Sequence, residues 1–450
     1  MLRRAIAIIT LAAVSYAAPA ADPAALTLSE AIRQALAQNP RQISQRLEVD
    51  KAGQLREAAR GANWPVLDLS ASATRYGYPT FVYPIRELGK FPPLDDTIYD
   101  YGVTLKLPLY AGGRLTQGVT LADLGREVAL ERERLGAQEL TYNVSAVYMK
   151  IQHLAALAQA YGARIASLEA QERRVRLLRQ VGKAAKLDHL KIGGLLTKAR
   201  HDRLQIENRR REAYTLLYQF MGTDRPAGEA ALQRYVAAPV PSWSLEDFRR
   251  DAAQRPELKI AEQQSTGAAA QEAIARGERL PAVSLLGGYR ERGGSDRNFQ
   301  DDWNVGVQLS LPLVDGGVRR AHAGEAAAAR AQAEQAIEQT RLEVARQVQD
   351  AWDAHAEAGS RLDVTETSVE EAAEALSIEK LKYEQGVGTI TDLLAAESAL
   401  LTAQADRLQA RFDLIVARFN LLRASGALVP ERVTALVAPE NGGAQESPRP

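Results

Sequence analysis

Apolar and polar residues alternate along four short segments of the chain. In one of them Val103, Leu105 and Leu107 occupy every second position, and Thr104 and Lys106 lie between them. A period of two residues is typical of a strand with one apolar and one polar face. The pattern predicts two pairs of strands, over residues 65–76 with 100–109 and over residues 281–290 with 303–313.

A period of seven residues follows each strand pair. Its apolar positions include Leu362, Val369 and Leu376, and then Leu394 and Leu401. Seven-residue spacing is the seam of a coiled coil. At a rise of about 1.5 Å per residue, the two longer helices would each span on the order of 100 Å. The pattern predicts long helices over 114–180 and 318–384 and returning helices over 188–221 and 392–424.

The two halves of this pattern are copies of one another. The twelve residues that begin at Gly102 return at Gly306 with eight identities, and the offset of 204 also carries Gly182 onto Gly386. Such a repeat is a duplicated structural unit. Each unit is expected to open with one further helix. The predicted division is a first repeat over 22–222, a connector over 223–243, a second repeat over 244–426 and a C-terminal extension over 427–450 with a disordered tail.

Prolines punctuate the expected junctions between helices and strands. Proline cannot donate a hydrogen bond to a sheet or continue a helix, so it marks the change from one element to another. The first repeat also has twelve more residues than the second around its strand pair, which predicts a long loop around residues 78–100. The junction prolines are Pro65, Pro108, Pro281 and Pro312.

The N-terminal residues have the features of an export signal. Arg3 and Arg4 precede an apolar run, and small residues end at Ala20. This predicts a signal peptide over residues 1–21. The sequence has no cysteine, so we expect neither a lipid anchor nor disulfides. No later apolar run reaches about 18 residues, so any membrane contact is expected to come from strands.

The composition argues against nucleic-acid binding and catalysis. The chain has 56 basic and 56 acidic residues, whereas a nucleic-acid partner needs a net basic face. The five histidines are scattered without metal-binding spacing, and Gly182-Lys183 lacks the flanking residues of a phosphate loop. We expect no enzyme activity, no cofactor and no metal site.

The number of strands predicts an oligomer. Strands of about ten residues are long enough to cross a bilayer. Four strands cannot close a barrel, and open sheet edges are not tolerated in lipid. Known small barrels have about eight strands or more. Three copies of the chain would supply twelve, so we expect a homotrimer in contact with outer-membrane lipid.

These features together resemble the TolC family of outer-membrane efflux proteins: an export signal, tandem halves, strand pairs flanked by Pro and Gly-Gly, and heptad-rich hairpins. The resemblance covers residues 24–436. It implies a mixed α/β membrane protein, with a trimeric twelve-stranded transmembrane β-barrel continuing into a long periplasmic α-helical coiled-coil tunnel.

The resemblance also implies a function and partners. Family members are passive exit ducts in the outer membrane of Gram-negative bacteria. They serve tripartite efflux or type I secretion systems. A periplasmic adaptor opens the duct, and an inner-membrane pump of the RND, ABC or MFS type supplies the energy.

The resemblance places the gate at the helical tips. The turn from Tyr383 to Leu394 is similar to the family's tip motif, and Asp392 matches the first of two aspartate rings that constrict the tunnel. Three such carboxylates around one axis would favour cations. Ala395 occupies the second position, so a less acidic entrance is expected. Asp392 beside Thr391 also fits a helix N-cap, and the two roles are compatible.

The family also ties its two hairpins together in the closed state. Asp188 and Tyr383 match one such pair and are expected to hydrogen-bond. Leu187 and Gly388 stand where the second tie would need a threonine and an arginine. The resemblance therefore predicts a resting gate with fewer restraints.

Two glycines match the positions at which the adaptor's helical hairpin docks. They are Gly182 and Gly386. A glycine that ends a helix with positive φ would give the same pattern. Both interpretations stay open from the sequence.

The alternative to an exit duct is a soluble periplasmic coiled-coil adaptor or structural protein without a membrane barrel. Such a protein would explain the heptad-rich hairpins. It would not explain strands with one apolar face, or the aromatic residues between Tyr76 and Tyr99, whose rings suit a membrane interface.

Overall fold

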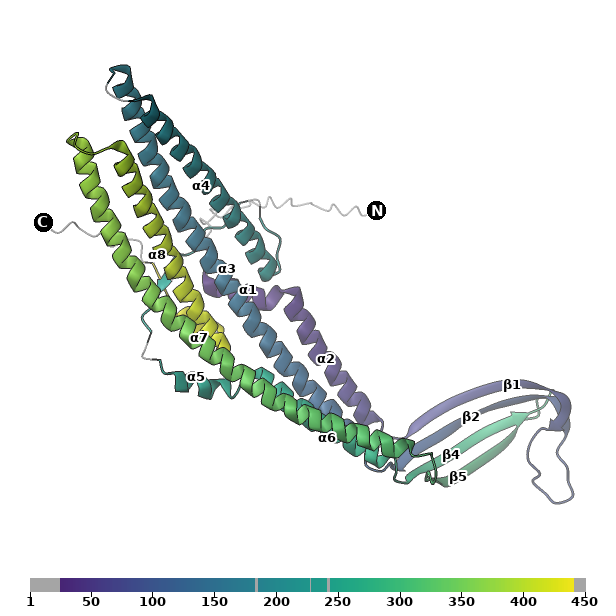
Figure 1. Cartoon of the computed structure of the whole chain (residues 1–450). Coiled ribbons are helices and arrows are strands. Elements are labelled where there is room, and N and C mark those ends of the chain that lie inside the picture. The colour runs from purple at the N-terminus through teal and green to yellow at the C-terminus, as the bar shows by residue number, and fades with distance from the viewer. Residues whose placement is uncertain (1–24, 183–184, 227, 241–242, 441–450) are drawn as a thin grey trace, which may run out of the picture.

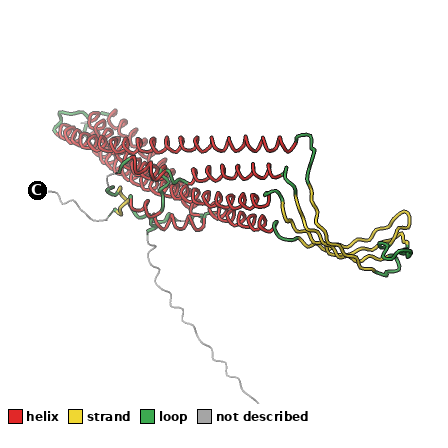
Figure 2. The backbone as a smooth tube through the Cα atoms, turned by 90° about the horizontal axis from the view of Figure 1, so that it is seen from below, coloured by secondary structure: helices red, strands yellow, loops and turns green. Residues whose placement is uncertain are grey.

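The chain folds into a long rod with a β-sheet at one end and helical tips at the other (Figure 1). In the computed structural model the described residues are 25–182, 185–226, 228–240 and 243–440. The expected signal peptide and the last ten residues lie outside this part of the chain. Figure 2 shows that the strands continue from the helices through short loops.

The first repeat contains two short helices, a strand pair and a long helical hairpin. In chain order they are α1 (Leu28–Gln38), α2 (Pro40–Gly61), β1 (Val66–Phe81), β2 (Leu94–Tyr110), α3 (Arg114–Gln180) and α4 (Lys186–Met221).

The second repeat has the same order. Its elements, with those that flank them, are β3 (Tyr235–Ala237), α5 (Leu245–Ala252), α6 (Pro256–Gly277), β4 (Ala282–Gly293), β5 (Gln300–Ser310), α7 (Val318–Glu384), α8 (Ile390–Ala424), α9 (Pro430–Ala435) and β6 (Val437–Pro439).

Each repeat opens with two helices and not with the single helix expected. Helix α1 ends just before Asn39, and α2 begins at Pro40. Proline suits the first position of a helix because it has no N–H to donate and clashes with a preceding turn. The Asn39 side chain accepts hydrogen bonds from the amides of Arg41 (2.9 Å) and Gln42 (3.3 Å). The second repeat breaks at the corresponding proline, Pro256.

The four long strands form one antiparallel sheet in the order β1-β2-β4-β5. The register places apolar residues of all four strands on one face and mainly polar residues on the other. Strands β1 and β5 are the two edges, and neither edge is paired among the described residues. Two neighbouring rows across the sheet are Leu69, Val103, Tyr289 and Trp303 on one face and Asp68, Thr104, Gly288 and Asn304 on the other.

The first strand pair is longer than its alternating pattern indicates. Strand β1 continues to Phe81 and β2 begins at Leu94, so the loop expected around 78–100 shrinks to residues 82–93. Cross-strand pairing resumes after one irregularity, which carries the hairpin past the alternating segment. Pairing between backbone groups forms this extension. Because such pairing requires no particular side chains, the alternating pattern does not indicate it.

Three of the four junction prolines lie at the ends of strands. Pro65 and Pro281 precede β1 and β4, and Pro312 follows β5. Pro108 instead lies inside β2, beside a register shift against β4. Pairing of β2 with β1 stops at Lys106, so the missing N–H of Pro108 interrupts no bond to β1, as is usual for proline at an irregularity.

The main apolar core lies at the middle of the rod. There α1 and α5 cover the long helices around the buried side chains of Tyr148 and Phe419, and α9 packs on α1. Strand β6 of the C-terminal extension pairs with β3 of the connector. The sequence pattern did not indicate this two-stranded sheet, because three-residue strands have too few positions to show a period.

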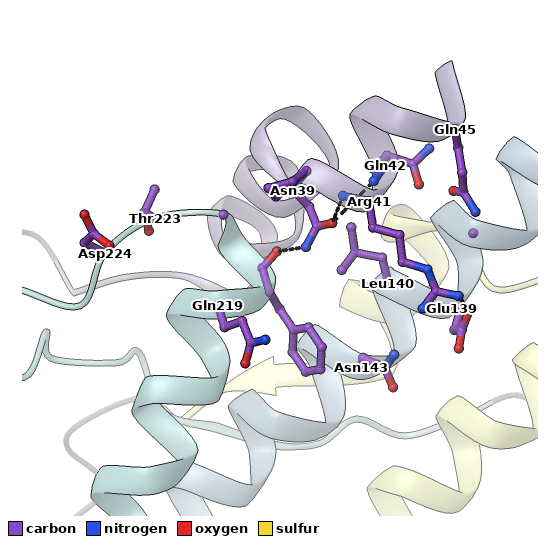
Figure 3. A pocket seen from close by; sticks show the side chains of 14 residues that line it. Asn39, Arg41, Gln42, Gln45, Glu139, Leu140, Asn143, Gln219, Thr223 and Asp224 are labelled. Carbon is purple, nitrogen blue, oxygen red and sulfur yellow. Dashed lines mark hydrogen bonds and ion pairs between the residues drawn. The ribbon is translucent and has the colours of Figure 1, made fainter. Parts of the chain in front are cut away.

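Equivalent contacts in the two repeats cap the C-terminal ends of α4 and α8, which also lie at the middle of the rod. Asn39 Nδ2 donates to the carbonyl of Phe220 near the end of α4 (2.9 Å), and Arg255 Nη1 donates to the carbonyl of Ala424 at the end of α8 (3.0 Å). The last carbonyls of a helix have no partner inside it. Two different side chains therefore satisfy the same need in the two repeats. Beside Asn39 a hollow of about 580 Å³ remains (Figure 3).

The long helices form a slab in the order α4, α3, α8, α7. Helix α4 packs on α3, α3 packs on α8, and α8 packs on α7, so α4 and α7 are its two edges (Figure 1). Among the helices of the described residues, none is long and apolar enough to span a membrane.

Candidate functional site

Glycines with positive φ shape both helical tips. Gly182 follows α3 with φ of 73°, and Gly386 lies after α7 with φ of 79°. The Gly182 amide donates to the carbonyl of Arg179 (3.0 Å), and the Gly386 amide donates to that of Tyr383 (3.2 Å). A Cβ at either position would meet no described atom beyond its chain neighbours within 4 Å. Both glycines are needed for backbone angle and not for space. Their role in adaptor docking stays a prediction.

Replacing Gly386 with alanine is expected to destabilise the tip of α7 and α8 by about 1–2 kcal/mol, because an L-residue pays that cost in the left-handed region. The matched control is Gly359→Ala inside α7, where the added Cβ also meets open space and removal of glycine should stabilise the helix by about 1 kcal/mol. Hydrogen exchange of amides near each site measures both effects. Equal effects of the two changes would contradict this role for Gly386.

One apolar cluster joins the two hairpins near their tips, and we call it the tip cluster. It draws residues from three helices, and Tyr383 and Leu376 of α7 pack against it. Its buried members are Leu168 and Val175 of α3, Ile192, Leu196 and Ala199 of α4, and Ile390, Leu393 and Leu394 of α8. The hairpins of one chain therefore share a core at the tips as well as at the middle.

Asp392 takes part in a capping box at the start of α8. The cap residue is Thr389, and Asp392 is the third helical residue. The N-cap therefore lies three residues before Asp392, the residue at which it was expected. The Asp392 amide donates to Thr389 Oγ1 (3.2 Å), and the Thr389 hydroxyl donates to Asp392 Oδ2 (2.6 Å). The carboxylate remains exposed. The box fixes its direction, and its role in a gate stays a prediction.

The expected tie between Asp188 and Tyr383 is not made within the described residues. The Tyr383 ring instead packs on the tip cluster, with the Arg174 guanidinium 5.7 Å from its centre. A different bond links the hairpins at this level: Lys191 Nζ of α4 donates to Thr391 Oγ1 of α8 (3.0 Å). Both contacts join a basic side chain of the first hairpin to the second.

A buried ion pair between the hairpins was not predicted from the sequence. The Arg164 guanidinium of α3 pairs with the Glu397 carboxylate of α8, and the two side chains are 7% and 11% exposed. Ser167 Oγ donates to the same carboxylate (3.1 Å), and Gln171 Nε2 also donates to it. Burial lowers the pKa of Arg164. We call these four residues the buried polar cluster.

One sequence signal could have revealed this cluster. Glu397 lies three residues after Leu394 and four before Leu401, at a position of the heptad that faces the partner helix. A charged residue there must find an opposite charge when it is buried. The sequence does not say which arginine pairs with it, because the partner is 233 positions away.

The described residues hold no cluster of histidine, aspartate and glutamate side chains that could bind a metal ion. The candidate site consists of apolar and polar contacts between the two hairpins of the chain.

Comparisons with known proteins agree with this architecture. A model of the family described as outer membrane efflux protein matches residues 31–223 and 250–427. OprJ of Pseudomonas aeruginosa is 27% identical over 307 residues, which are 64% of this chain and 62% of OprJ. CyaE of Bordetella pertussis is 30% identical over 47% of this chain and 46% of its own length. The matched part spans less than two thirds of each of these relatives.

Solved structures share the fold at low identity. VceC of Vibrio cholerae superposes with a TM-score of 0.77 at 19% identity, over 89% of this chain and 96% of that one. CmeC of Campylobacter jejuni gives 0.78 at 16% identity, over 90% and 86%. The open state of MtrE of Neisseria gonorrhoeae gives 0.75 at 19% identity, over 90% of each chain.

The expected fold class is confirmed by these likenesses, since the neighbours are outer-membrane channels with a barrel and a helical tunnel. The family model covers most of both repeats and breaks at the connector between them. The chain belongs to the outer membrane efflux protein family.

Proposed function

We propose that the protein is a passive exit duct of the outer membrane, and that it performs transport and not catalysis. The observation that carries the proposal is the four-stranded sheet. Its apolar face has no cover among the described residues: Leu69, Val307 and Leu309 are 80%, 66% and 66% exposed. An apolar face on one side and a polar face on the other suit a wall between lipid and water.

The free edges of the sheet support a trimer. The unpaired backbone of β1 and β5 would have to be satisfied in lipid, where water is absent. If β5 of one chain pairs with β1 of the next, three chains close a barrel of twelve strands. The long helices that continue from the strands would then line a tunnel below the membrane.

The tips are proposed as the gate. In a threefold assembly three exposed Asp392 carboxylates would approach one axis and give the entrance a preference for cations. A periplasmic adaptor docking at Gly182 and Gly386 would release the contacts between hairpins. The energy would come from an inner-membrane pump of the RND, ABC or MFS type, in a tripartite efflux or type I secretion system.

The test is the mass of the protein by light scattering after detergent extraction of membranes. A particle of three chains, recovered only in the detergent fraction, is expected. Reconstituted in planar bilayers, it should conduct ions, and Asp392→Asn should reduce the cation preference without changing the mass. A detergent-free monomer or dimer in the periplasmic fraction would refute the barrel and favour a soluble coiled-coil adaptor.

A further inference from the structure

A hollow of about 710 Å³ lies along the contact of α3 with α8 and is also lined by α7, by β3 and by Glu440, which follows β6. We call it the seam hollow. Because α3 and α8 are the inner helices of the slab, the seam hollow is formed within one chain and needs no second copy. Its volume falls in the range of about 300–1,000 Å³ that is typical of sites for small molecules.

One part of the wall of the seam hollow is apolar. It includes Ala156 and Ala160 of α3, which lie one turn apart, and Leu408 and Phe412 of α8. The Phe412 ring stacks on the His153 imidazole, with the ring centres 5.3 Å apart. Burial lowers the pKa of His153, so the imidazole is neutral at pH 7 and adds no charge. An apolar group can therefore lie against this wall.

The charged residues around the seam hollow leave one arginine without a carboxylate. Arg234 pairs with Glu440 (3.7 Å). Arg411 pairs with Glu366 (3.1 Å). Arg407 has no ion-pair partner among the described residues, and its Nε is buried without a hydrogen-bond acceptor. Leaving a buried donor of a charged group unpaired is costly, and an anion in the seam hollow would supply the missing acceptor.

The first repeat shows which acceptor Arg407 lacks. Its counterpart 204 positions earlier is Arg203 of α4, in the same run of Asp-Arg-Leu-Gln. Arg203 Nε donates to Glu207 Oε1 (2.9 Å), one turn further along the helix. The residue equivalent to Glu207 is Arg411. The second repeat therefore has a positive charge where the first has the acceptor, and both of its arginines line the seam hollow. Two guanidinium groups one turn apart suit a carboxylate or a sulfonate.

We propose that the seam hollow binds an organic anion of small-molecule size. Its carboxylate or sulfonate would bind Arg407 and Arg411, and its apolar body would lie against Ala156 and Phe412. A bound anion would thus contact both hairpins of the chain. The inference goes beyond the proposed exit duct and does not depend on it, because every residue of the site belongs to one chain.

The test is isothermal titration calorimetry with 4-phenylbutanoate, a carboxylate with an aromatic body. The protein is purified in a neutral detergent, and the heat of mixing with protein-free micelles is subtracted. One molecule of 4-phenylbutanoate is expected to bind per chain, with an affinity that falls as salt is added. The matched neutral compound, 4-phenylbutanamide, has the same body without the charge and should bind at least about tenfold more weakly.

Three variants assign the binding to the two arginines. Arg407→Gln should weaken binding of 4-phenylbutanoate by about tenfold or more, because it removes a charged donor. Arg411→Glu reproduces the arrangement of the first repeat and gives Arg407 a partner inside the chain, so it should weaken binding as much while Arg407 is retained. Arg203→Gln is the matched control on α4 and should leave binding unchanged. Light scattering checks that each variant keeps the mass of the unmodified protein.

Three results would overturn the proposal: no binding of 4-phenylbutanoate, equal binding of the acid and the amide, or an equal loss in Arg203→Gln and Arg407→Gln. Binding that is seen only after removal of residues 441–450, which follow Glu440 in the sequence, would also overturn it and assign the seam hollow to that segment. None of these results bears on the exit duct. Conversely, a monomeric protein that binds 4-phenylbutanoate as expected would refute the duct and leave this site standing.

Discussion

Replacing Glu397 with alanine will loosen the two hairpins of the chain from each other near the tips. The change leaves Arg164 buried without its partner, and removing one member of a buried pair costs about 3–5 kcal/mol. Ser167 and Gln171 also lose their acceptor. Hydrogen exchange of amides in α3 and α8 around these residues should become faster. Open events of the channel in planar bilayers should become more frequent.

The control removes both charges together. Arg164→Met with Glu397→Leu replaces the pair with apolar groups, and such replacements of a buried ion pair are often neutral or stabilising. The double variant should therefore keep the slow exchange that Glu397→Ala loses. If it loosens the hairpins as much as the single variant does, the unpaired charge is not the cause. What holds the hairpins is then something that both variants remove, either side-chain packing or the carboxylate that accepts from Ser167 and Gln171.

Placing an arginine on the apolar face of the sheet will prevent stable insertion in the membrane. Val307→Arg points into the face that includes Val305 and Leu309, and an arginine facing lipid near the bilayer midplane costs about 2–4 kcal/mol. The charge would appear three times in a trimer, once for each chain. Heat-stable trimers in outer-membrane fractions, counted by gel mobility without boiling, should fall sharply.

The neighbouring position provides the control for this change. Gln308 is next in β5 and belongs to the opposite face, where it pairs with Ser284 of β4. Gln308→Arg should therefore leave the trimer intact. If both arginines are tolerated, or both are harmful, the assignment of faces to lipid and water is wrong.

Much of the fold could be predicted because apolar residues recur at regular spacings along its strands and helices. Alternation in β2 and the heptads of α7 and α8 extend over many residues, and the 204-residue offset repeats them. Elements without a period were missed. The break at Asn39-Pro40 depends on one cap, and strand β3 has three residues.

The site was less predictable than the fold, because its contacts join residues far apart in sequence. The position of Asp392 at the start of α8 follows from a local motif, although the cap proved to be Thr389. The partner of Tyr383 does not follow from the sequence. Arg174 and Asp188 lie on either side of the first hairpin's tip, and the packing of the helices decides which of them reaches the Tyr383 ring. To predict a buried pair such as Arg164 and Glu397, one must know which residues of two separate helices face each other, and the pattern of apolar residues along the chain does not give this.

The unequal lengths of the two strand pairs have a consequence for the cell surface. Strands β1 and β2 have 16 and 17 residues, whereas β4 and β5 have 12 and 11. In the proposed trimer each chain would contribute one tall and one short hairpin, so the outer mouth would be a crown of three lobes separated by three notches. The stacked rings of Phe81 and Phe91, 6.3 Å apart, lie on these lobes. Antibodies or phages that meet the bacterium from outside would then touch the first repeat before the second.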